Sequence, residues 1–211
     1  MSTQGTSEQE RWSAWWNQGR PDALSSEEFE ALMEHWVKTD GHSGAEPSDK
    51  LSAYTALNAV RMRRVLKTYK MSDSMKTLLD TGRCAGQHWV LITESWCGDA
   101  AQSTPLIAAW AQRAGVPLDW VLRDGENGLI DDFLTRGGRA VPMWIVSDTL
   151  GEVLHCWGPR PQPAMEMVNQ YRILPEPKPP YAEFAAEVQL WYARDKGRTI
   201  EEEAREMLAA E

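Results

Sequence analysis

The stretch that decides the fold is "HWVLITESWCGDAAQSTPLIAAW", His88 to Trp110. It begins with a largely apolar run, typical of a strand that is covered on both faces of a sheet. An alanine-rich helical pattern starts directly after Cys97 and ends at Gly115, a residue type that commonly closes helices. The turn between the two patterns therefore places one cysteine at the amino end of a helix.

The chain after Gly115 continues to alternate between strand and helix patterns. We expect a strand over 116–124, a short helix over 127–138, an antiparallel hairpin of strands over 141–148 and 151–158, and a helix over 163–172. The order strand, helix, strand, helix, strand, strand, helix predicts an α/β fold with a mixed central sheet and helices on both faces.

Helical segments flank this region on both sides. We predict a helical N-terminal extension over 1–83, a main domain over 84–174, and a C-terminal tail over 175–211 that packs on the main domain as two helices. The extension carries a long helical pattern from Ser48. Its expected buried positions are Leu51, Leu57, Val60, Val65 and Leu66.

The same helix carries a cluster of basic residues, which has two interpretations. The members are Arg61, Arg63, Arg64, Lys67 and Lys70. A solvated face paired with the acidic termini of the chain is the simpler interpretation. A patch for an anionic ligand is the alternative.

Composition excludes several functional classes. A formal net charge of −9 disfavours binding to nucleic acid or to anionic membranes. We find no secretory signal and no apolar segment long enough to span a membrane. Three cysteines do not form a disulfide framework, so we expect a soluble protein in a reducing cytoplasm. Scattered histidines predict no structural metal, and we expect no cofactor.

Several motifs together resemble the thioredoxin family. They are Trp96-Cys97-Gly98, Pro105 eight residues after the cysteine, and "GGRAVP" ending at Pro142, where the hairpin opens. The resemblance implies a thioredoxin fold with helical N- and C-terminal extensions. It also implies that Cys97 is the nucleophile, that Trp96 shields it, and that Pro142 is a cis-proline lying against it. The wider chain is similar to bacterial thioredoxin-family proteins with the same two extensions.

Two positions depart from the dithiol members of that family. Ala100 stands where they have a second cysteine, so no disulfide can form within the motif. Leu91 stands where the family often has a buried aspartate that helps to move the proton. Exchange at Cys97 would therefore need an external resolving thiol.

The reactivity of Cys97 depends on opposing effects. Backbone N–H groups at a helix start lower a thiol pKa from about 8.5 towards 7. Asp99 stabilises the helix start, but its charge disfavours the thiolate. Glu94 either adds to that effect or accepts a proton if it is buried. The sequence leaves this balance open.

Other residues receive weaker assignments. Arg139 and Val141 are predicted to bind substrate because they precede the cis-proline and should lie near Cys97. The simpler interpretation of Arg160 is structural, as a residue at the end of a strand. The alternative is that it holds the anionic end of a thiol ligand. Cys84 and Cys156 are expected to be structural rather than resolving cysteines.

The sequence supports two functional hypotheses. In the first, Cys97 carries out thiol–disulfide exchange or another redox reaction with a protein disulfide or a low-molecular-weight thiol. In the second, the thioredoxin fold is redox-inactive and binds a partner protein at the groove beside Pro142.

Overall fold

The computed structural model describes residues 10–210, and residues 1–9 and 211 lie outside the described part. The predicted extension and tail therefore each include residues that the structure does not describe. Within residues 10–210, no helix combines the length and apolar character needed to cross a bilayer.

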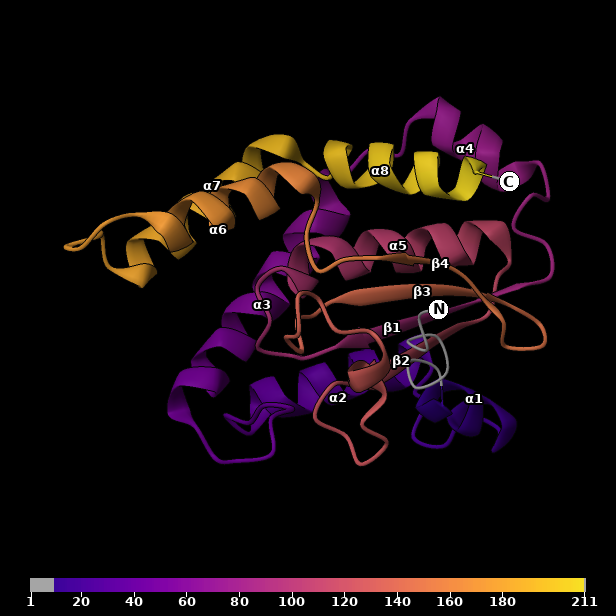
Figure 1. Cartoon of the computed structure of the whole chain (residues 1–211), viewed down its shortest axis with the longest axis horizontal. Coiled ribbons are helices and arrows are strands. Elements are labelled where there is room, and N and C mark those ends of the chain that lie inside the picture. Colours follow the sequence, from indigo (N-terminus) through magenta and orange to yellow (C-terminus); the bar gives the residue numbers. More distant parts are fainter. Residues whose placement is uncertain (1–9, 211) are drawn as a thin grey trace, which may run out of the picture.

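The centre of the protein is a four-stranded mixed sheet with the order β2-β1-β3-β4 (Figure 1). The strands are β1 (Gln87–Thr93), β2 (Leu118–Leu122), β3 (Met143–Asp148) and β4 (Val153–Trp157). β1 pairs with β2 in parallel and with β3 antiparallel, and β3 pairs antiparallel with β4. Strand β1, which precedes the Cys97 motif, is therefore internal and is buried along almost its whole length.

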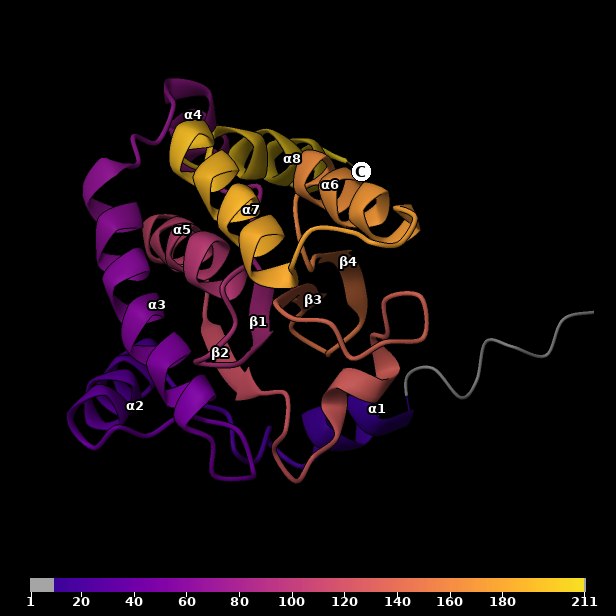
Figure 2. The same ribbon diagram turned by 90° about the vertical axis from the view of Figure 1, so that its left-hand side faces the viewer.

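Helices cover the two faces unequally. The described helices are α1 (Glu10–Asn17), α2 (Ser26–Lys38), α3 (Asp49–Thr68), α4 (Asp73–Asp80), α5 (Ala100–Ala114), α6 (Gln162–Ile173), α7 (Tyr181–Asp195) and α8 (Arg198–Ala209). Figure 2 shows α3, α5 and α7 together on one side of the sheet and α1 on the other. This architecture is the predicted α/β thioredoxin fold with extra helices at both ends.

The larger apolar core lies between the sheet and α5. Trp89 and Trp144 project from adjacent strands, with ring centroids 4.8 Å apart, and Trp110 of α5 packs on Trp144. All three indoles are fully buried. Phe184 and Val188 of α7 join the same core, so the C-terminal helices contribute to the main hydrophobic cluster.

The opposite face is covered mainly by a segment that the sequence places in the N-terminal extension. Trp12 and Trp15 of α1 are buried against Val90, Ile92 and related strand residues. A short 3₁₀ helix, η1 (Leu129–Asp132), shares this face. The helix predicted over 127–138 is thus only one short turn, because the segment contains glycines and its last residues form a separate turn.

Helix α3 corrects one prediction about burial. Leu57, Val60 and Leu66 were expected in the core, yet they are 44%, 54% and 55% exposed. The predicted Val65 is buried together with Ala59, and the remaining buried positions of α3 are the polar Thr55 and Asn58, which face polar groups of the Cys97 motif. The buried side of this helix therefore combines polar contacts to the motif with apolar contacts to the core.

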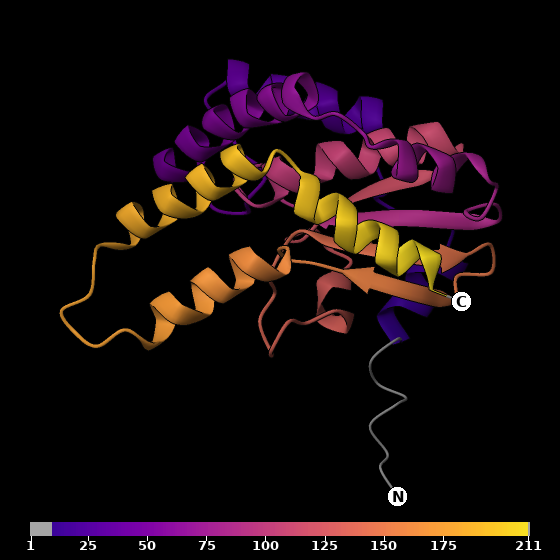
Figure 3. The same ribbon diagram turned by 90° about the horizontal axis from the view of Figure 1, so that it is seen from above.

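Helix α6 and the first helix of the C-terminal tail, α7, form an arm beside the motif. Figure 3 shows α6 and α7 running side by side away from the sheet, joined by the Pro-rich connector. Tyr171 of α6 stacks on Phe184 of α7, with ring centroids 4.2 Å apart. The start of α6 follows directly from β4, so this arm is anchored next to the sheet edge.

Candidate functional site

Cys97 lies in the short loop between β1 and α5. Its backbone N–H donates to the carbonyl of Glu94 at 3.1 Å, which turns the chain sharply after the strand. α5 then begins at Ala100 and continues through the buried Pro105. The side chain of Asp99 makes no capping hydrogen bond, which differs from its expected role at the helix start.

The thiol of Cys97 is almost completely enclosed. The residue is 8% exposed. Its Sγ donates to the carbonyl oxygen of Val141 at 3.1 Å and accepts a longer contact from the backbone N–H of Ala100 at 3.5 Å. The Val141–Pro142 peptide bond is cis, as the resemblance implies. The hairpin entry and the motif thus meet at the sulfur.

Burial decides the protonation of this thiol. It raises the pKa of Cys97 to about 12, and the charge of Asp99 adds to the increase. The backbone N–H groups of Ala100 and Asp99 and the charge of Arg160 act in the opposite direction but do not compensate. The balance that the sequence leaves open therefore favours a protonated thiol at neutral pH.

This protonation predicts a simple pH profile for alkylation. In a Cys84→Ala, Cys156→Ser background, the rate of iodoacetamide reaction at Cys97 should rise about tenfold per pH unit from pH 7 to 10. It should show no plateau, because the pKa of about 12 lies above this range. The rate is measured by quantitative mass spectrometry. A plateau below pH 9 would contradict a thiol that is protonated at neutral pH.

Asp99 is the centre of a buried polar network. One carboxylate oxygen pairs with Arg160 at 2.7 Å, and the other accepts from the hydroxyl of Tyr192 at 2.9 Å. Burial raises the pKa of Asp99, whereas Arg160, Tyr192 and Arg61 lower it. These partners solvate an ionised carboxylate. The network joins the motif to both α6 and α7, since Arg160 precedes α6 and Tyr192 lies within α7.

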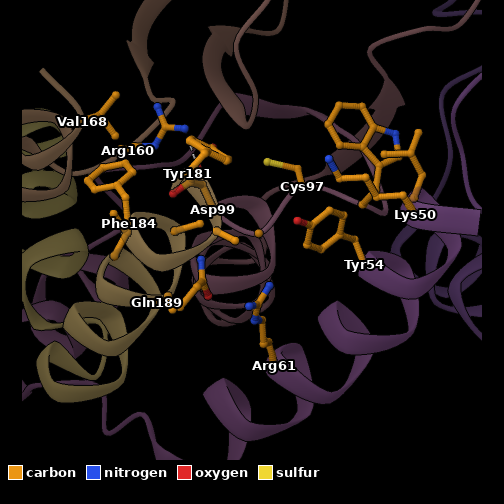
Figure 4. Close-up of a pocket in the computed structure, with 17 residues that line it drawn as sticks. Lys50, Tyr54, Arg61, Cys97, Asp99, Arg160, Val168, Tyr181, Phe184 and Gln189 are labelled. Atoms are coloured by element: carbon orange, nitrogen blue, oxygen red, sulfur yellow. Dashed lines mark ion pairs between the residues drawn. The ribbon is translucent and has the colours of Figure 1, made fainter. Parts of the chain in front are cut away.

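A pocket of about 430 Å³ opens beside the motif, with Cys97, Gly98 and Asp99 in its wall. The remaining lining comes mainly from α3, Arg160 before α6, Val168 within α6, and α7. Figure 4 shows Tyr54, Arg61 and Gln189 directed towards the space in front of Cys97, and it marks the ion pair of Asp99 with Arg160. The pocket is therefore built jointly by the motif and the two extensions.

Polar side chains of α3 hold the motif loop in place. The amide of Asn58 donates to the carbonyl of Ser95 at 2.9 Å, and Arg61 donates to Asn58 at 2.8 Å. Thr55 and the hydroxyl of Ser95 are 2.8 Å apart. This chain of contacts fixes the position of the guanidinium of Arg61 relative to the loop.

Gly98 allows two side chains to approach the motif closely. A Cβ at this position would lie 3.2 Å from Nη1 of Arg61 and 3.1 Å from Nε2 of Gln189. Both contacts are tighter than ordinary van der Waals packing. The absence of a side chain at Gly98 thus lets donors from α3 and α7 reach the backbone beside Cys97.

Glu94 is buried, but its contacts go to other groups. It accepts from the hydroxyl of Ser43 and from the backbone N–H of Asp124, the latter at 2.9 Å. Burial raises its pKa. Its described side-chain hydrogen bonds stabilise the loops around the motif, and none is made to the thiol of Cys97.

The structure separates the two arginines considered for ligand binding. The guanidinium of Arg139 pairs with Asp131 of η1 at 2.6 Å, and Arg139 does not line the pocket. Its role in substrate binding stays a prediction. Arg160, the less favoured of the two on sequence grounds, lines the pocket beside Cys97.

The remaining sequence candidates occupy supporting positions. Trp96 lines the pocket, and Arg123 lies over its ring with 4.7 Å to the centroid. Leu91 is fully buried in the main core. Cys84 is also buried, whereas Cys156 is exposed on the edge strand β4. Neither of these two cysteines lines the pocket with Cys97.

Several site residues are not found by sequence reasoning. The sequence analysis singles out none of Lys50, Tyr54, Gln189 and Tyr192 as a site residue. These residues reach the site only through the packing of α3 and α7. No local sequence motif therefore marks them as site residues. Only Arg61 carries a signal, through the basic cluster on its helix.

The fold and the cysteine loop opposite a cis-proline define a thioredoxin-fold protein. The chain also belongs to a thioredoxin family: the Thioredoxin_9 family model, described as thioredoxin, matches residues 44–172, which is more than half of the chain. The match begins before α3, so it includes part of the segment predicted as an N-terminal extension.

Two solved structures are similar to this chain. An HIV epitope scaffold is 15% identical, with 89% of this chain and 100% of the scaffold covered and a TM-score of 0.48. A protein of unknown function from Pseudomonas aeruginosa is 16% identical, with 84% and 98% covered and a TM-score of 0.43. No curated protein matches the chain.

Proposed function

We propose that this thioredoxin-family protein carries out thiol–disulfide exchange at Cys97 with a low-molecular-weight thiol or disulfide that enters the pocket. The observation that carries the proposal is the position of Cys97 in the wall of a 430 Å³ pocket. Such a volume suits a small organic ligand. A protein disulfide is a less suitable substrate, because it would have to reach a cysteine that is only 8% exposed.

The exchange step conserves atoms and electrons. The Cys97 thiol loses its proton to solvent, and the thiolate attacks one sulfur of the bound disulfide. A new bond forms between that sulfur and Sγ, while the second sulfur leaves as a thiolate and is protonated. Because Ala100 cannot resolve the mixed disulfide, a second external thiol must release the protein thiol.

The high pKa of Cys97 makes binding in the pocket important for the rate. With a pKa of about 12, the thiolate fraction at pH 7 is about 3,000-fold below that of an ordinary cysteine. The greater nucleophilicity of a basic thiolate recovers only about 40-fold. Collision with free disulfides should therefore be slow, whereas a ligand held next to Sγ gains from its high effective concentration.

A test uses oxidised glutathione with the Cys84→Ala, Cys156→Ser protein and intact-mass measurement at pH 8. We expect one mixed-disulfide adduct, formed at a rate that saturates with disulfide concentration because binding precedes reaction. The matched control adds Cys97→Ser and should give no adduct. A folded protein that forms no adduct, while the urea-unfolded protein does, would contradict thiol exchange.

The second hypothesis, a redox-inactive binding module, is favoured by the hydrogen bond from Sγ to the carbonyl of Val141. In that case the thiol is a structural donor that holds the cis-proline hairpin against the motif. Ligand binding would then be equally strong in the Cys97→Ser variant, whose hydroxyl can donate to the same carbonyl. The folded protein would form no adduct with oxidised glutathione.

A further inference from the structure

The side chains that line the pocket carry an excess of positive charge. Lys50, Arg61 and Arg160 line the pocket, and Asp99 is the one carboxylate among the lining residues. Asp99 is already paired with Arg160. The whole chain is acidic, with a formal net charge of −9, so these cations do not reflect a generally basic surface.

The described residues place no carboxylate in ion-pair contact with Arg61 or Lys50. Within residues 10–210, neither forms an ion pair, and the guanidinium of Arg61 donates to the side-chain oxygen of Asn58. Burial and the nearby Arg64 lower the pKa of Arg61. A half-buried guanidinium without a carboxylate partner favours an anionic ligand that supplies one.

Neutral donors surround the same space. The hydroxyl of Tyr54 and the side chain of Gln189 point into the pocket beside Arg61 (Figure 4). The carbonyl of Gln189 accepts from Gln102 at 2.7 Å, and this contact turns its amide nitrogen towards Gly98. The donor groups therefore converge on the region in front of the motif backbone.

Apolar groups form the remaining wall. Phe184 and Val188 of α7 and Val168 of α6 line the pocket next to the cations. A ligand that fits both walls carries negative groups at one end and a less polar section at the other. A free inorganic anion would use only the cationic wall.

We infer that the α3 and α7 wall is a carboxylate-binding subsite for a small organic anion, with Arg61 as the principal cation and Lys50 as a weaker partner. The inference rests on the proposed function only in one respect, namely that the ligand contains a sulfur atom that reacts with Cys97. Binding of its carboxylates does not depend on that reaction. It explains how a disulfide would be oriented towards Sγ, because the carboxylates would be held on one side of the motif while the sulfur faces Cys97.

The test measures binding without sulfur exchange. S-methylglutathione carries two carboxylates and cannot form a disulfide, and its dimethyl ester lacks both negative charges. Isothermal titration calorimetry with the wild-type chain should give saturable binding of the acid, weakened at least tenfold in the ester. Raising the ionic strength should also weaken binding, because the cationic wall is partly exposed.

Matched variants on one helix locate the subsite. Arg61→Gln should increase the Kd about tenfold, and the more exposed Lys50→Gln about threefold. Arg63→Gln removes an exposed charge of the same helix outside the pocket and should leave the Kd unchanged. Lys50 lies at the exposed start of α3, so its substitution leaves the fold intact even if that of Arg61 does not.

Three outcomes would overturn the subsite. They are the absence of binding by S-methylglutathione at millimolar concentration, equal binding of its ester, and equal weakening by Arg63→Gln. Each can occur while the mixed-disulfide adduct still forms at Cys97. Conversely, binding without an adduct would support the subsite and contradict only the exchange reaction.

Discussion

Asp99→Asn should raise the alkylation rate of Cys97 at pH 7 about ten- to fiftyfold. After burial, the charge of Asp99 is the largest contribution that raises the pKa of Cys97. Removing a buried like charge lowers a pKa by about 2 to 3 units. The thiolate fraction rises accordingly, and the lower nucleophilicity of the less basic thiolate offsets roughly half of that gain on a logarithmic scale.

Arg160 adds to the expected effect. In the wild-type protein this guanidinium is paired with Asp99 at 2.7 Å and lowers the pKa of Cys97. Without the carboxylate, its charge is free to stabilise the thiolate. The variant should therefore also be more sensitive to oxidation.

Tyr192→Phe is the matched control for this experiment. It removes one hydrogen bond to Asp99 but keeps the negative charge beside the thiol. Its alkylation rate should stay within about threefold of the wild-type rate. Both variants are checked for folding by near-ultraviolet circular dichroism, since tryptophan packing dominates that signal. Equal rates for Asp99→Asn and wild type would show that burial alone sets the pKa of Cys97.

Arg160→Met should lower the free energy of unfolding by about 3 kcal/mol at pH 7, as expected when one partner of a buried ion pair is removed. The side chains of Arg160 and Asp99 are only 20% and 11% exposed, so water compensates little. Urea titration followed by fluorescence measures the loss. Arg63→Met is the exposed control, and its effect should stay within about 0.5 kcal/mol.

The loss in free energy of unfolding caused by Arg160→Met should become smaller at low pH. Burial already raises the pKa of Asp99, and Arg160 opposes that increase, so its removal raises the pKa further. A carboxyl group with a raised pKa in the folded state favours folding at low pH, and this contribution is lost as the pH rises through that pKa. The deficit is thus largest at pH values above the raised pKa of Asp99 and decreases as the pH falls through that pKa.

The double variant Asp99→Asn, Arg160→Met separates charge from packing. It removes both ions, so most of the lost stability should return. A deficit that stays independent of pH and is not recovered in the double variant would mean that the stem of Arg160 acts through packing alone. That result would contradict a stabilising role for the ion pair between Asp99 and Arg160.

The sequence predicted the central fold because its signals are local. The apolar strand before Trp96, the alanine-rich helix to Gly115 and the Val141–Pro142 pair each depend on residues that are close in the chain. Their order is enough to specify the mixed sheet and to bring the motif opposite the hairpin. The fold class and the family membership follow from these patterns.

The burial of α3 could not be predicted in the same way. Apolar periodicity placed Leu57, Val60 and Leu66 inside, but the buried side of the helix carries Thr55 and Asn58 beside the apolar Ala59 and Val65. Hydrogen bonds from Asn58 and Thr55 to Ser95 outweigh the apolar pattern at this position. A rule based on hydrophobicity cannot anticipate this result, because the partner groups lie almost forty residues away in the chain.

The sequence by itself determined that one cysteine stands at the start of a helix, that Ala100 cannot resolve it, and that the chain has the thioredoxin pattern. Only the tertiary structure decided that this thiol is protonated and that a cationic pocket lies beside it. The reason is physical: burial of Cys97 and the pairing of Asp99 with Arg160 and Tyr192 arise when α6 and α7 pack against the motif. These long-range contacts leave no local pattern in the chain.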